Sequence, residues 1–220
     1  MRDQKLDQMR QKKQKKRNYK REIEMILYHM SQTLRLGDKL IPDYQKNTEL
    51  AAPFIQALEQ SVDCFYGMVL NAKYMYAVLN KFRLREWSDY AKWATEGAFE
   101  FVRKTEFPDS YGRMQSNYFY DNLLNCKRFY DYEWGEENEE EQQKVHLFEV
   151  EVDDVAPQQR DGSIYDEGYN AMSDAQDVQH VLACARRYFA GEQTPEPVWE
   201  IMSDKPARAT KDITDYLRKC

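Results

Sequence analysis

The side chains best suited to catalysis or metal binding are few and far apart in this sequence. Its three histidines fall on three different expected elements, and at least 36 residues separate successive cysteines. These residues are His29, His146, His180, Cys64, Cys126, Cys184 and Cys220. The sequence contains no HExxH, CxxC, nucleophile-elbow or glycine-rich phosphate-loop motif, the short-range patterns that mark many such sites. We therefore expect a protein that is not an enzyme, with no catalytic residue, no metal site and no cofactor.

Charged residues, by contrast, are strongly segregated along the chain. Residues 1–21 hold ten lysines and arginines against two aspartates, a net charge of +8. Residues 131–167 hold 14 acidic against two basic residues, a net charge of −12, although the whole chain carries only −6. Such blocks are typical of segments that bind partners of opposite charge.

The basic block predicts contact with a polyanion, because neutralising phosphates releases condensed counterions. Its dense part is predicted to bind DNA or RNA and consists of Lys12, Lys13, Lys15, Lys16, Arg17, Lys20 and Arg21. Two alternatives are a solvated helical extension without a partner and docking onto an acidic protein surface, including block 131–167 of a neighbouring copy. Membrane binding is disfavoured, because only Leu6, Met9 and Tyr19 could insert.

The acidic block is the candidate protein-interaction site. Its centre is Glu136, Glu137, Glu139, Glu140 and Glu141. A solvated loop or an exposed helical turn would explain the same run, and mimicry of a nucleic-acid backbone or metal binding are the more specific alternatives. The run lacks the Asp/Asn-Gly pattern of a calcium loop, which argues against a metal.

The elements that would position these groups are expected to be mostly helical, since the chain has only 8 glycines and 7 prolines. Apolar spacing predicts a helix over 22–36, extendable upstream to Asp3, and a long central helix over 48–82. A third helix is expected from residue 88 or 89 to about 106, and a fourth from residue 109 or 110 to about 130.

The second half of the chain is less regular. Alternating apolar residues predict one strand over 144–152 with no evident partner, which would itself suggest an interaction. The Ser173–Gln176 capping box predicts a helix to about Phe189, closed by Gly191. Short helices are expected over 198–202 and 210–217.

The predicted fold is therefore mainly α. It is a helical bundle with a long central helix, a basic N-terminal helical arm, and a small irregular α+β C-terminal part with one or two strands. The expected units are the basic arm (1–21), the bundle (22–130), an acidic linker with the strand (131–167), and short helices with a proline-broken tail (168–220).

These features favour a non-enzymatic structural or assembly component of a larger nucleoprotein complex, such as a virion or ribosome-associated part. Its partners would be other protein subunits and nucleic acid, and not a membrane, since the sequence contains no stretch of 18 apolar residues. The alternative is a free-standing adaptor that binds a basic protein through residues 131–167. Widely spaced cysteines predict free thiols in a reducing intracellular compartment, the cytoplasm or a virus particle assembled there. Mitochondrial import also remains open, because the N-terminus is basic and could be helical.

Overall fold

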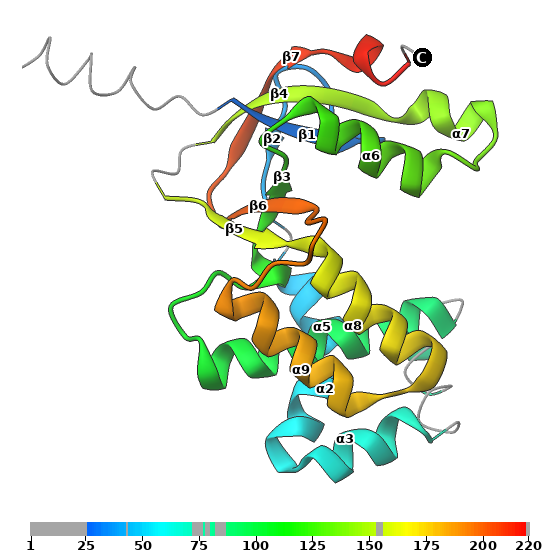
Figure 1. Ribbon diagram of the computed structural model, residues 1–220, viewed down its shortest axis with the longest axis vertical. Helices are drawn as coiled ribbons and strands as arrows, with labels where there is room; N and C mark the ends of the chain where they lie inside the picture. Colours follow the sequence, from blue (N-terminus) through cyan, green and yellow to red (C-terminus); the bar gives the residue numbers. More distant parts are fainter. Residues whose placement is uncertain are drawn as a thin grey trace, which may run out of the picture.

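The computed structural model describes residues 26–42, 44–71, 77, 80–81, 87–152 and 156–218. Within these residues, seven strands form two antiparallel sheets, and helices pack against both (Figure 1). The prediction of a mainly α helical bundle with one or two strands is therefore wrong, and the protein is a mixed α and β structure. The N-terminal basic arm falls outside the described residues.

Sheet A has four strands in the order β1-β4-β7-β2. Its strands are β1 (Leu27–Ser31), β4 (His146–Val152), β7 (Ala207–Asp212) and β2 (Lys39–Leu40). The predicted strand over 144–152 is confirmed as β4, but it is not alone. It lies between β1 and β7, with Leu27 opposite Val150 and Val152 opposite Ala207.

Sheet B has three strands in the order β3-β6-β5 and lies between sheet A and the main helical layer (Figure 1). Its strands are β3 (Asn117–Phe119), β6 (Trp199–Ser203) and β5 (Gln158–Asp161). Phe119 and Ile201 join a small core with Phe148 and Val150 of β4. The two sheets therefore share one apolar contact layer.

The helices form two groups. The larger group builds the main core and contains α2 (Tyr44–Gln60), α3 (Val62–Val69), α5 (Trp87–Glu106), α8 (Gly162–Ala175) and α9 (Val178–Ala190). The smaller group contains α6 (Leu123–Trp134), which packs on β1, and the short α7 (Glu139–Lys144). Single 3-10 turns form η1 (Arg113–Gln115) and η2 (Thr214–Tyr216). No described helix has the length and apolarity needed to span a membrane.

Local capping explains where several helices begin and end. The Asp177 side chain accepts a hydrogen bond from the His180 amide at the start of α9, and Gly191 ends this helix with a φ of 77°. The predicted end at Gly191 is confirmed, but Ser173 lies inside α8 and does not cap α9. Ser61 caps α3 and separates it from α2, so the expected continuous helix from Thr48 is broken.

Four strands occur where helices were expected, because their apolar residues do not follow a simple alternation. In β1, Leu27 packs into the core shared by the sheets, whereas Met30 packs on the opposite face with α6 residues. A strand buried on both faces produces apolar spacing that resembles a helix. In β7 the buried positions are Ala207 and Ala209, which are too small to give a clear pattern. The strands β3 and β6 replace parts of the helices expected over 109–130 and 198–202.

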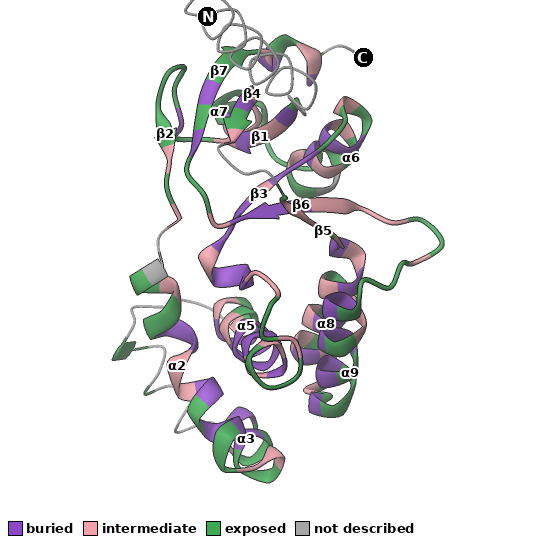
Figure 2. Cartoon of the chain, turned by 90° about the vertical axis from the view of Figure 1, so that its left-hand side faces the viewer, coloured by how far each residue is buried: buried purple, intermediate pink, exposed green. Residues whose placement is uncertain are grey.

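Helix α5 is the centre of the helical layer, and the predicted third helix is confirmed. It contacts α2, α8 and α9, and most of its middle is buried (Figure 2). Gly97 permits the close approach of α5 to α2, because a Cβ atom there would lie 2.6 Å from Cβ of Phe54. The packing of these two helices therefore requires a residue without a side chain.

Replacing Gly97 by alanine should destabilise the protein by about 1–3 kcal/mol, because the added methyl forces α2 and α5 apart. Gly67→Ala is the matched control in α3, where an added Cβ meets nothing within 4 Å. That variant should gain up to about 1 kcal/mol from reduced backbone entropy in the unfolded chain. Urea unfolding measures both, and equal effects of the two substitutions would contradict the proposed contact.

Candidate functional site

The most buried arginine or lysine in the described residues is Arg113 of η1. Its guanidinium lies where η1, α5, α8, α9, β3 and β6 meet, and only 7% of its side chain is exposed. Nη1 donates hydrogen bonds to Oη of Tyr188 at 2.8 Å and to Oε2 of Glu200 at 2.9 Å. Nε forms an ion pair with Glu96 at 3.4 Å. Arg113 thus joins side chains from α5, α9 and β6.

Aromatic rings enclose the same guanidinium. Its carbon lies 3.6 Å from the ring centre of Tyr165 and 5.1 Å from those of Tyr118 and Tyr188. Rings at these distances stabilise a cation through their quadrupoles. Burial opposes the charged form of Arg113, but its polar and acidic neighbours hold its pKa well above the usual value. Burial also raises the pKa of Tyr165 well above its usual value, so this phenol stays neutral.

This cluster is built to hold the structure together. Nε and Nη1 of Arg113 donate to protein acceptors, and two carboxylates more than balance its single positive charge. A substrate would have to displace these partners from a buried position, at a cost of several kcal/mol. We therefore assign Arg113 a structural role.

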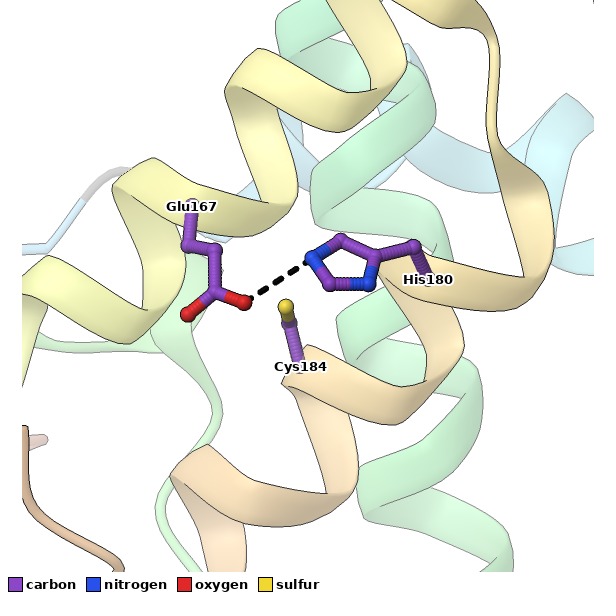
Figure 3. A group of neighbouring side chains, drawn as sticks. All are labelled: Glu167, His180 and Cys184. Carbon is purple, nitrogen blue, oxygen red and sulfur yellow. Dashed lines mark ion pairs between the residues drawn. The ribbon is translucent and has the colours of Figure 1, made fainter.

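A second cluster is partly open to solvent and lies between α8 and α9 (Figure 3). His180 and Cys184 are four residues apart on α9, which places them on one face of the helix. Glu167 of α8 lies opposite, with Oε1 2.9 Å from Nε2 of His180. One ligand atom from each residue lies within 4.8 Å of the others. A carboxylate, an imidazole and a thiol are a donor set that could hold a metal ion.

The surroundings of this cluster modify its chemistry. Burial, followed by the nearby Glu167, raises the pKa of Cys184 to about 11. The thiol is therefore protonated at neutral pH and is not an activated nucleophile. Arg187 of α9 forms an ion pair at 2.8 Å with Oε2 of Glu167, which leaves Oε1 facing His180.

No sequence pattern brings these three residues together. The His180–Cys184 spacing could be read from the sequence once a helix was expected there. Glu167 could not be added, because helix α8 was not expected and nothing local shows that it packs on α9. The other two histidines lie elsewhere. His29 is on β1, and His146 is on β4, where its Nδ1 lies 3.8 Å from Oδ2 of Asp212.

Of the predicted interaction residues, the structure describes the acidic group but not the basic group. The seven basic residues from Lys12 to Arg21 lie outside the described residues. Glu136 and Glu137 follow α6, and Glu139, Glu140 and Glu141 form the first turn of α7, capped by Asn138. All are exposed except the half-exposed Glu141, and Glu140 and Glu141 pair with Lys144. Acidic groups favour the start of a helix, so this run also has a local structural reason.

Loss of Arg113 should be among the most destabilising single changes. Arg113→Met leaves Glu96 and Glu200 without their shared cation, and breaking a buried pair in this way costs about 3–5 kcal/mol. Arg186→Gln is the control, because Arg186 and Glu106 form an ion pair in which both side chains are over a third exposed. It should cost less than about 1 kcal/mol. Chemical denaturation measures the free energy of unfolding of both variants. Similar losses of stability in the two would rule out a central role for Arg113.

His29 should make the protein sensitive to mild acid. Its Nδ1 lies 2.8 Å from the carbonyl oxygen of Tyr118, so Nδ1 carries the proton and donates it. Burial lowers the pKa of His29 below its ordinary value of 6.5, and the bond to Tyr118 acts in the opposite direction. Neutral His29 therefore contributes stability above pH 6.5, which is lost as pH falls through the folded-state pKa.

The free energy of unfolding should consequently fall less in His29→Gln than in the wild type between about pH 7 and about pH 5. Urea titrations at a series of pH values measure this difference. Parallel curves for the two proteins would show that His29 does not contribute.

Comparison with known proteins does not assign a function to these features. No protein-family model matches the chain, and a search of curated proteins finds no match. Its function must therefore be inferred from its own charges and geometry.

Proposed function

We propose that this protein is a non-enzymatic structural component of a larger nucleoprotein assembly, such as a virion or ribosome-associated part. In this proposal residues 1–21 bind nucleic acid, and the folded body contacts other protein subunits. The observation that carries the proposal is the net charge of +8 within 21 residues, placed a few residues before the first strand. Segments of this charge density bind polyanions because each phosphate contact releases counterions.

The position of the acidic residues is compatible with this use. The basic segment precedes Leu27, and Leu27 lies opposite Val150 on β4. Helix α7 precedes the other end of β4, at His146 (Figure 1). Four residues of a strand span about 13 Å, which exceeds the screening length of roughly 8 Å at physiological salt. Repulsion between α7 and a phosphate chain at the Leu27 end is therefore weak.

Two cations on sheet A could extend the basic surface. Lys39 of β2 and Arg208 of β7 are directly opposite each other, and both are exposed. Arg208 also lies opposite Glu151, the residue after Val150, so the cation pair is at the same end of the sheet as Leu27. A nucleic acid held by residues 1–21 could reach this pair.

The region around β2 also supports contact with a protein subunit. Among the described residues, β2 is the last strand on its side of sheet A. Leu36 and Ile41, on either side of β2, are 60% and 65% exposed. Exposed apolar side chains that lie close together at a surface are a common place for another chain to dock.

The alternative function is an adaptor that binds a basic protein through residues 131–167. The exposed glutamates at the start of α7 favour it, because this turn is ordered and capped. In either case we place the protein in a reducing intracellular compartment. Cys64, Cys126 and Cys184 support this, since all three are free thiols.

Nucleic-acid binding across a salt series tests the main proposal on the full chain. If the seven dense basic residues contact phosphates, log affinity should fall with log salt at a slope of about −5 to −6, using roughly −0.7 to −0.9 per contact. Replacing all seven with glutamine should remove most of this slope. Fluorescence anisotropy with labelled single- and double-stranded DNA and RNA measures the affinity at each salt concentration, which gives the slope.

The matched control replaces Glu136, Glu137 and Glu139 with glutamine and should leave the slope nearly unchanged. Binding that is independent of salt, or unchanged in the sevenfold variant, would overturn the nucleic-acid proposal. Capture of a basic protein partner that is lost only in the glutamate variant would instead establish the adaptor.

A further inference from the structure

The cluster between α8 and α9 serves no purpose in the proposed function, yet it brings three different metal-binding groups together. We propose that Glu167, His180 and Cys184 form a site for Zn²⁺ or a similar divalent transition-metal ion. The donors are Oε1 of Glu167, Nε2 of His180 and Sγ of Cys184, from two helices that make extensive mutual contacts.

The distances are close to those that zinc requires. Bonds of 2.0–2.3 Å in a tetrahedron place neighbouring ligand atoms about 3.3–3.8 Å apart. Oε1 of Glu167 and Nε2 of His180 are 2.9 Å apart, and the whole set lies within 4.8 Å. Side-chain movements of about an ångström would therefore bring all three ligand atoms to bonding distance from one ion, without moving the helices.

Both helices hold their ligands in place. His180 and Cys184 share one face of α9, so a single ion can reach both. Nη1 of Arg187 lies 2.8 Å from Oε2 of Glu167 and so fixes the carboxylate. The other oxygen, Oε1, is directed at His180 (Figure 3). Groups that orient a ligand in this way commonly strengthen metal binding.

The three ligands differ in exposure, with the soft sulfur donor buried and the other two open to solvent. Cys184 is buried, whereas the side chains of His180 and Glu167 are 44% and 36% exposed. The ion can therefore enter from solvent, and water would complete its coordination on the open side. On binding, the sulfur–hydrogen bond of Cys184 breaks, a sulfur–metal bond forms, and the proton leaves to water. The thiolate and the carboxylate of Glu167 then supply two negative charges to the ion, and Glu167 shares its charge with Arg187.

Cobalt and zinc titrations of the full-length protein test this proposal. Co²⁺ should bind in one equivalent and produce tetrahedral d–d bands together with a thiolate-to-metal charge-transfer band. Zn²⁺ should abolish these bands by displacement. Competition with a chromophoric chelator then gives the zinc affinity.

The variants His180→Gln, Cys184→Ser and Glu167→Gln should each weaken Zn²⁺ binding by at least about tenfold. Cys184→Ser should also remove the charge-transfer band, even where Co²⁺ still binds. The controls are His146→Gln and Cys64→Ser, which change an imidazole and an exposed thiol outside the cluster. Both should bind zinc as the wild type does.

Two results would overturn the proposal: no stoichiometric Co²⁺ or Zn²⁺ binding, or equal affinities for His180→Gln and His146→Gln. Either would show that Glu167 and His180 form an ion pair only. His180→Gln is informative even if the buried Cys184→Ser unfolds, because His180 lies at the surface. The outcome does not depend on residues 1–21, so it is separate from the test of nucleic-acid binding.

Discussion

The buried guanidinium of Arg113 is the constraint on which the arrangement of the other elements depends. A cation removed from water is tolerated only if acidic and polar groups surround it, and here these groups come from separate parts of the chain. Glu96 belongs to α5, Tyr188 to α9 and Glu200 to β6. All of them must reach Arg113 together, which fixes sheet B against the helical layer. A buried ion pair adds little net stability, but the cost of leaving Arg113 unpaired disfavours other arrangements.

The same constraint positions the proposed metal site. Tyr165 stacks on Arg113 and is two residues before Glu167, whereas Tyr188 binds Arg113 and is one helical turn after Cys184. The contacts of Arg113 with Tyr165 and Tyr188 therefore constrain how α8 and α9 are placed, and with them Glu167 and Cys184. Asp161 adds a second restraint, because its buried carboxylate caps α8 and accepts hydrogen bonds from Thr194 and from the amide of Val198. A rigid junction of this kind can hold three ligands within reach of one ion.

At the surface, unlike at Arg113, the acidic and basic groups that the proposed function invokes lie apart from each other along sheet A. The acidic first turn of α7 and the start of β1 lie at opposite ends of β4. The exposed pair of Lys39 and Arg208 lies on β2 and β7, at the same end of the sheet as Leu27. In the proposed function, the basic segment that precedes β1 and the acidic turn of α7 would therefore act from opposite ends of β4.

Elements whose signals are local could be predicted from the sequence. Helix α5, strand β4 and the end of α9 at Gly191 were predictable, because long apolar periodicity, alternation and a left-handed glycine depend only on neighbouring residues. The charge segregation and the His180–Cys184 spacing were also readable. Three features became visible only in the folded chain: the pairing of Leu27–Ser31 and Ala207–Asp212 with β4, the burial of Arg113, and the contact of Glu167 with His180. These features arise from contacts between residues far apart in the chain, and a strand buried on both faces carries no periodic pattern that distinguishes it from a helix.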